Sequence, residues 1–77
     1  FNSNKNVIAF IANHELQINS TKNITNIALY DISGKLIQTY VNEKSLEFKT
    51  KFYFAQGVYL VKIKLDNGIE VTKKIVH

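Results

Sequence analysis

Near the end of the chain, apolar and polar side chains alternate over residues 61–65 and again over 69–72, with the period of two that is typical of a β-strand. The runs that contain them, Val58–Leu65 and 69–76, flank the turn residues Asp66-Asn67-Gly68. Nowhere in the sequence do apolar residues recur at i, i+3, i+4 and i+7 between capping residues, so no helix is expected. The pattern therefore predicts an all-β fold that ends in an antiparallel hairpin.

The register of this hairpin depends on the length of its loop. A two-residue Asn67-Gly68 loop would place apolar and charged side chains together on each face. A three-residue loop keeps one face mostly apolar and opposes unlike charges on the other, with Gly68 as the left-handed residue that ends the loop. We prefer the three-residue loop, which predicts five cross-strand pairs, the last of them unfavourable: Leu65 with Ile69, Lys64 with Glu70, Ile63 with Val71, Tyr59 with Ile75, and Val61 with Lys73.

Shorter alternating runs predict further strands upstream. Two turns separate them: Asn13-His14 joins the first pair, and Asp31-Ile32-Ser33-Gly34 has the Asp and Gly positions of a type I turn. With the final hairpin, the count reaches about seven short strands, which favours an antiparallel β-sandwich. The upstream strands are expected at residues 7–12, 15–18, 27–30, 35–40 and 45–49.

A chain of 77 residues has room for one domain and buries only about 60% of the surface that its unfolded form exposes. It contains no cysteine for a disulfide, so the hydrophobic core must supply its stability. We expect a single domain over residues 1–77 whose core draws on both sheets. The expected core residues are Val7, Phe10, Leu16, Ile18, Ile27, Leu29, Leu36, Phe48, Tyr59, Val61, Ile63, Val71 and Ile75. The sequence leaves open which of Phe52, Tyr53 and Phe54 point inward, because three consecutive aromatic residues break the alternation.

The sequence offers little for catalysis, metal binding or a cofactor. Its two histidines, His14 and His77, lie in a turn and at the last position, and the carboxylates are scattered singly. The net charge of +4 comes from lysine without any arginine, which argues against a sequence-reading nucleic-acid binder. We therefore expect neither an enzyme nor a nucleic-acid partner. The lysines form a solvated surface, or else attract an anionic one such as lipopolysaccharide.

Two motifs, with the basic pair near the end of the chain, carry a family resemblance. The first is Ile-Ala-Leu-Tyr-Asp-Ile-Ser-Gly-Lys-Leu over residues 27–36, and the second is Gly-Val-Tyr-Leu-Val-Lys-Ile over residues 57–63. In this order they resemble the type A C-terminal sorting domain of the type IX (Por) secretion system of Bacteroidetes. The resemblance covers residues 24–77; near the first turn, only Asn13 matches the Pro-Asn-Pro usual in the family. The matching motif residues, largely structural in role, are Tyr30, Asp31, Gly34, Lys35, Gly57, Val58, Tyr59 and Gly68.

The resemblance implies a seven-stranded immunoglobulin-like sandwich at the C-terminus of a larger secreted protein. It implies a sorting signal that directs a periplasmic cargo through the type IX translocon, with outer-membrane shuttle and sortase components as partners. A surface sortase would then remove the domain, leaving the cargo at the cell surface, attached to anionic lipopolysaccharide, or secreted. We expect the last strand to lie at a sheet edge and to carry the recognition residues Lys73, Lys74, Ile75 and Val76.

Another function remains open for the same fold. A β-sandwich of this size also suits an adhesion or carbohydrate-binding module attached to a surface protein. Core packing is the expected role of most of the aromatic residues, and the sequence has no tryptophan for stacking on sugars. The ending at Ile75-Val76-His77, without a trailing linker, favours the sorting function.

Overall fold

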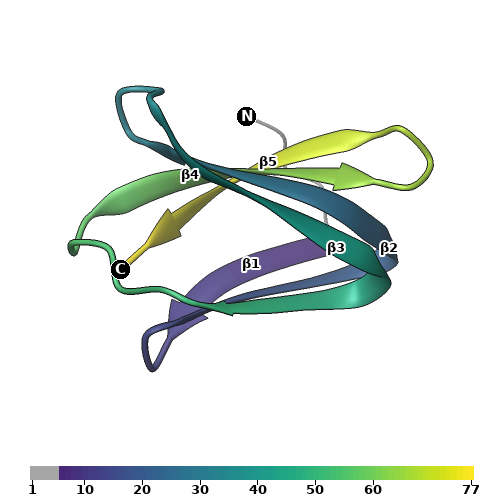
Figure 1. The fold of residues 1–77 in the computed structure, drawn as a ribbon, viewed down its shortest axis with the longest axis horizontal. Coiled ribbons are helices and arrows are strands. Elements are labelled where there is room, and N and C mark those ends of the chain that lie inside the picture. Colours follow the sequence, from purple (N-terminus) through teal and green to yellow (C-terminus); the bar gives the residue numbers. More distant parts are fainter. Residues whose placement is uncertain (1–5) are drawn as a thin grey trace.

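The computed structural model describes residues 6–77, and every regular element in that range is a β-strand (Figure 1). All strand pairs are antiparallel. The order of hydrogen-bonded neighbours is β1-β2-β4-β5, with β3 paired to β2 as well. The strands are β1 (Val7–Ala12), β2 (Glu15–Asp31), β3 (Leu36–Lys51), β4 (Val58–Leu65) and β5 (Glu70–Val76).

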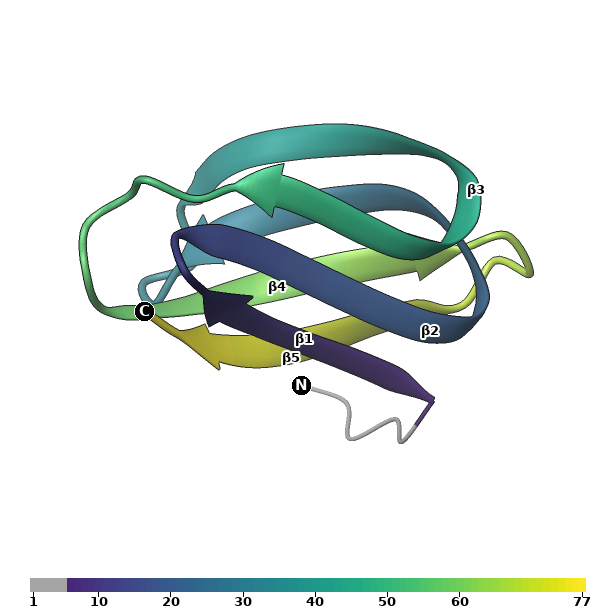
Figure 2. The same cartoon turned by 90° about the horizontal axis from the view of Figure 1, so that it is seen from below.

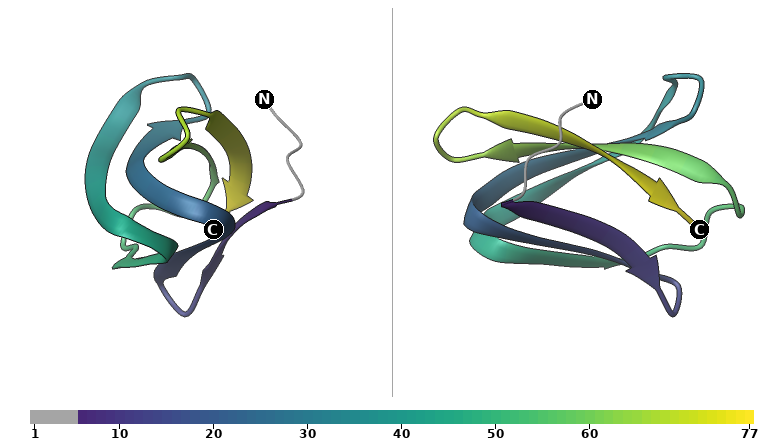
Figure 3. Two further views of the ribbon diagram at one scale, coloured as in Figure 1. Left: turned by 90° about the vertical axis from the view of Figure 1, so that its right-hand side faces the viewer. Right: turned by 180° about the vertical axis from the view of Figure 1, so that it is seen from behind.

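Strands β2 and β3 are long and bent, and each belongs to two layers. The first part of β2, residues 15–19, pairs with β1 and with the end of β3. Its second part, residues 24–31, pairs with the start of β3 and with β4, beyond which lies β5. By these pairings, one layer has three strand segments and the other has four. The sheet thereby curls over itself into two layers (Figures 2 and 3).

The expectation of about seven strands is wrong, because residues 6–77 form five. The polar runs 20–23 and 42–44 resemble turns in sequence, yet the backbone continues through them as bent strand. The register between β2 and β3 shifts on both sides of Ile24, as at β-bulges, which add local bend and twist. Lys44 takes a left-handed φ of 32° within the bend of β3.

The predicted turns are confirmed. Asn13 and His14 both have positive φ, 54° and 59°, and Ala12 faces Glu15 across a two-residue hairpin loop. The Gly34 amide donates to the carbonyl of Asp31 at 3.0 Å, closing the four-residue turn.

The three-residue loop of the final hairpin is also confirmed. Tyr59 lies opposite Ile75, and Val61 lies opposite Lys73. The Leu65 amide donates to the Ile69 carbonyl at 2.9 Å.

The core fills the space between the two layers and contains most of the expected residues. Phe52 is fully buried and Phe54 is half-buried, while Tyr53 is 71% exposed, which resolves the aromatic triplet. Ile24 and Leu65 are core residues that were not expected from the sequence, and Phe52, whose direction was open, joins them. The buried residues are Val7, Leu16, Ile18, Ile24, Ile27, Leu29, Phe52, Tyr59, Val61, Ile63, Leu65, Val71 and Ile75.

Three expected core residues are placed differently. Phe10 is 39% exposed because Val7, Ala9 and Ile11 occupy the inner face of β1, and Phe10 has the opposite parity. Leu36 is 50% exposed because a register shift in the β2–β3 ladder sets it beside the outward-facing Tyr30. Phe48 packs against the core but stays half-buried.

Strand β5 ends the hydrogen-bonded order, so the expectation of a last strand at a sheet edge is confirmed. Strand β1 is at the other end of that order, and the curl brings β1 and β5 side by side without a ladder between them (Figure 2). The free edge of β5 therefore faces β1.

Candidate functional site

The Tyr-Asp-x-x-Gly-Lys motif builds the β2–β3 turn. Asp31 Oδ1 accepts hydrogen bonds from the Ser33 hydroxyl at 2.6 Å and from the amides of Ser33 and Lys35, both at 2.9 Å. These hydrogen bonds lower the pKa of Asp31 below its ordinary value. The bond from the Ser33 hydroxyl has the largest effect, and the bond from the Lys35 amide has the next largest. Gly34 has a φ of 92°, which favours glycine. Asp31, Gly34 and the Lys35 backbone therefore act in shaping the turn.

The Gly-Val-Tyr motif fixes the start of β4. Gly57 exchanges two backbone hydrogen bonds with His77, at 3.2 and 2.9 Å, and Val58 pairs with Val76. Tyr59 is 7% exposed, and its hydroxyl donates to the carbonyl of Ala55.

Gly68 closes the final hairpin. Its φ of 87° is left-handed, and its amide donates to the Leu65 carbonyl at 3.0 Å. Its role, like that of the Gly-Val-Tyr motif, is structural.

The four expected recognition residues do not form one surface, because neighbours on a strand face opposite ways. Ile75 is 2% exposed and belongs to the core, whereas Val76 is 64% exposed. Lys73 lies opposite the buried Val61 and is half-buried, while Lys74 is exposed. Lys74 and Val76 are therefore the members of the set that solvent reaches best.

Lys74 instead shares a surface with Tyr30. Lys74 pairs with Leu60 across β5 and β4, and Leu60 pairs with Tyr30 across β4 and β2. One cross-strand row thus joins a residue of the first motif to the basic pair, about 10 Å apart at the spacing of neighbouring strands. The Lys62 ammonium lies 5.7 Å from the centre of the Tyr30 ring, within range of a cation–π contact.

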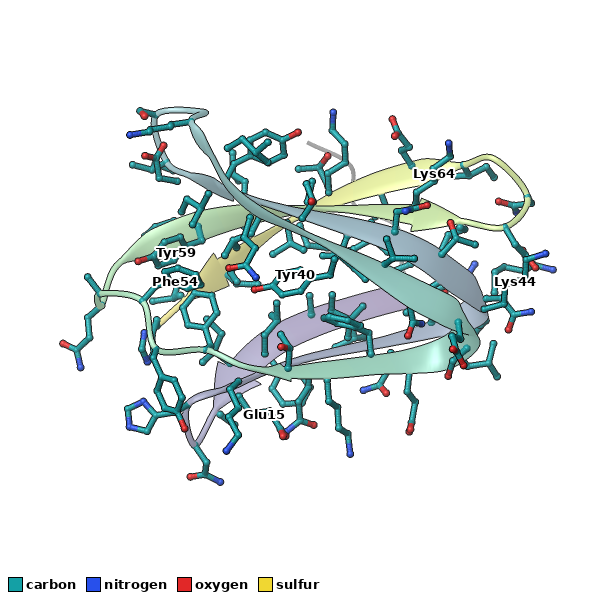
Figure 4. The ribbon with its side chains drawn as sticks, viewed as in Figure 1. Glu15, Tyr40, Lys44, Phe54, Tyr59 and Lys64 are labelled. Carbon is teal, nitrogen blue, oxygen red and sulfur yellow. The ribbon has the colours of Figure 1, made fainter. Side chains whose placement is uncertain are left out.

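The outward surface of the four-strand layer has a net positive charge, and we call it the basic face. Figure 4 shows Lys64 projecting outward from it, whereas Tyr40, Phe54 and Tyr59 lie between the layers. Burial raises the pKa of Tyr40, as expected for a phenol on the inner side. By strand register, the basic face comprises Asn26, Ala28, Tyr30, Leu36, Thr39, Val41, Val58, Leu60, Lys62, Lys64, Glu70, Thr72, Lys74 and Val76.

The outward surface of the three-strand layer differs in charge. There Glu15 lies opposite Lys51, Gln17 opposite Lys49, and Asn19 opposite Glu47, so acids and lysines balance. The basic face carries Lys62, Lys64 and Lys74 against Glu70, a net charge of +2 (three minus one). Of the two outward surfaces, only the basic face therefore carries a net positive charge, and it also presents Tyr30.

A hollow of about 180 Å³ opens on the basic face. Its centre is Ala28, whose methyl group leaves space between the larger side chains of Lys62 and Thr39 on the neighbouring strands. The lining residues are Asn26, Ile27, Ala28, Thr39, Tyr40, Val41, Lys62, Lys64 and Glu70. Lys62 and Lys64 were not expected as site residues, although the alternation within Val58–Leu65 already sets them opposite the core face.

One end of the molecule holds an aromatic cluster around His77. Its ring lies 5.2 Å from Phe52 and 5.7 Å from His14, both edge-on, and His14 lies 5.9 Å from Tyr53. The cluster ties the end of β5 to the β1–β2 turn and to the β3–β4 loop. Over residues 6–77, no three His, Asp or Glu side chains gather where they could hold a metal ion. The same span contains no helix long and apolar enough to cross a membrane.

These features define a small all-β domain whose antiparallel sheet curls into a β-sandwich-like fold. The family model described as domain of unknown function DUF8694 matches residues 1–77, and the chain belongs to that family. No curated protein matches the sequence.

Among solved structures, CopC from Methylosinus trichosporium OB3b is similar, with a TM-score of 0.57 and 19% identity. The match covers 91% of this chain and 82% of CopC. At this identity the likeness is one of fold.

Proposed function

We propose that this chain is a sorting domain that directs an attached cargo protein through type IX secretion across the outer membrane. The observation that carries the proposal is the row Tyr30–Leu60–Lys74, which joins both motif-bearing segments on one exposed, basic face. A sorting signal needs a folded surface that a receptor can recognise, and it needs no catalytic group. The motif residues that shape turns would hold this surface in place.

The finer topology that we infer is immunoglobulin-like. The bends of β2 and β3 divide the five strands into straight segments, three in one layer and four in the other. Near the start of β4, the Tyr59 hydroxyl donates to a carbonyl four residues upstream. A tyrosine that bonds back in this way is typical of immunoglobulin-type sandwiches.

Recognition on this proposal is carried by Lys74 and Tyr30, with Val76 at the exposed end of β5. Ile75 contributes through the core, because its side chain is 2% exposed. Strand addition at the edge of β5 is a weaker mechanism than we expected, since β1 lies beside that edge. The partners are the type IX translocon and the shuttle or sortase components, which meet the domain at the periplasmic side and at the cell surface.

The test is secretion of a reporter in a Bacteroidetes host. Residues 1–77 are fused behind a signal peptide and a fluorescent protein, and export is compared between the parent strain and one that lacks type IX secretion. Lys74→Gln is the informative variant, because removing the whole tail would also remove the buried Ile75 and unfold the domain. Lys49→Gln, on the opposite outward surface, is the matched control.

We expect surface or medium fluorescence only in the secretion-competent strain, with a clear loss for Lys74→Gln and none for Lys49→Gln. Periplasmic retention of a folded parent fusion would refute the sorting function. In that case, binding of the folded domain to a glycan array would support the adhesion or carbohydrate-binding module instead.

A further inference from the structure

The hollow on the basic face has an apolar floor and a positively charged side. Ala28 forms the floor, and Val41, which is 83% exposed, forms part of the wall towards β3. Lys62 and Lys64 stand on β4, directly opposite Ala28 and Asn26 of β2. A group that enters the hollow therefore meets methyl surface below and the side chains of two lysines at one side. The Lys62 ammonium lies 5.7 Å from the centre of the Tyr30 ring, so it must turn from that ring to reach the group.

The charges around the hollow favour an anion. Glu70 lies opposite Lys64 and offsets one of the two lysines, which leaves a net charge of +1 among the lining residues. Lys74 lies on the same face and adds to the positive potential. The Asn26 amide and the Thr39 hydroxyl also line the hollow and supply neutral hydrogen-bond donors.

The size of the hollow limits what it can hold. A drug-sized ligand occupies about 300–1,000 Å³, whereas this hollow measures about 180 Å³. That volume suits a single amino-acid side chain. The apolar floor adds a second restriction, because it gives no partner to a wholly polar anion such as phosphate but can pack against methylene groups.

We propose that this hollow binds the side chain of a glutamate presented by a protein partner. The methylenes pack on Ala28 and Val41, and the carboxylate accepts hydrogen bonds from Lys62 and Lys64. The acidic partner is indicated by the charge of the basic face, in contrast to the balanced surface of the other layer. The inference holds for any protein that docks on this face, whether or not the domain directs secretion.

The test is an NMR titration of the isotope-labelled 77-residue chain with a blocked peptide, acetyl-Gly-Thr-Glu-Thr-Gly-amide. Its matched control has glutamine in place of glutamate. We expect saturable shifts of the Ala28, Thr39 and Lys62 amides, with the glutamine peptide about fivefold weaker, as for an exposed ion pair. Binding should also weaken in 1 M salt, where the screening length falls to about 3 Å.

Two variants separate the parts of the site. Ala28→Val fills the hollow while keeping both lysines, and should weaken binding because the glutamate side chain no longer fits. Lys62→Gln removes a charge while keeping the hollow, and should weaken binding about fivefold. Lys49→Gln, on the other outward surface, should leave binding unchanged. The amide spectrum of each variant reports whether it is folded.

Three results would overturn the proposal: no saturable shifts at the hollow, equal binding of the glutamine peptide, or unchanged binding by folded Ala28→Val. Inorganic phosphate that shifts the same amides at equal or lower concentration would also overturn it, because the hollow would then be a general anion site.

Discussion

Replacing Phe52 by alanine is the change that most directly tests the packing of the core. The Phe52 side chain is fully buried, and its ring lies edge-on to those of Phe54, Tyr59 and His77, at 5.1 to 5.2 Å. Burial of such a ring removes on the order of 150–200 Å² from water, worth about 4–5 kcal/mol at 25 cal/mol per Å². Because alanine retains part of that area and a cavity adds to the cost, we expect a loss of about 3–5 kcal/mol in the free energy of unfolding.

That loss is comparable with the total stability of about 4–12 kcal/mol expected for a domain of this size. The assay is urea denaturation followed by circular dichroism, with the thermal midpoint as a second measurement. Tyr53→Ala is the matched control, because the neighbouring ring is 71% exposed and should cost less than about 0.5 kcal/mol. A Phe52→Ala protein within about 1 kcal/mol of the parent, or an equal loss in Tyr53→Ala, would refute the proposed packing.

Three further changes test local features. Lys44→Gly should stabilise the domain by about 0.5 kcal/mol in urea denaturation, because glycine adopts the left-handed φ of 32° without strain. The control Lys49→Gly, in straight strand, should destabilise the domain. A stabilising Lys49→Gly with a destabilising Lys44→Gly would contradict the assignment of the bend. The lowered pKa of Asp31 means that its stabilisation is present above the unfolded pKa and is lost as pH falls through the folded value. Asp31→Asn should therefore flatten the dependence of the thermal midpoint on pH below about pH 4, and an unchanged slope would count against the turn hydrogen bonds. Tyr59→Phe should cost about 1 kcal/mol by chemical denaturation, because it removes the hydrogen bond to Ala55, and a neutral effect would argue against that bond.

The elements that could be predicted from the sequence are those set by local pattern. The register of the β4–β5 hairpin follows from alternation and from one left-handed glycine, and the structure has the expected pairs. Ile24 could not be found in this way, because it lies three residues before Ile27 and strict alternation would point the two in opposite directions. The register shift between Ile24 and Asn26 turns the Ile24 side chain inward. The sequence does not reveal this shift, because such bulges depend on pairing with distant strands.

The candidate site was predictable only in part for the same reason. Lys74 could be singled out from the sequence, but its proximity to Tyr30 depends on β4 lying between β2 and β5. That strand order is a property of the whole fold, and no local pattern encodes it. The outward direction of Lys62 and Lys64 was predictable, whereas the hollow beside them requires Ala28 from another strand.

The shared strands also determine where the chain tolerates inserted residues. An insertion at Asn13-His14, at residues 31–34 or at residues 66–68 lengthens a surface loop and leaves every ladder in register. One extra residue at 20–23 would turn all later side chains of β2 to the opposite face. Since the second part of β2 belongs to the four-strand layer, this shift of register would move its core side chains to the solvent face and its outward side chains into the core. We therefore expect tags and grafted peptides to be accepted at the hairpin tips and rejected at the bends.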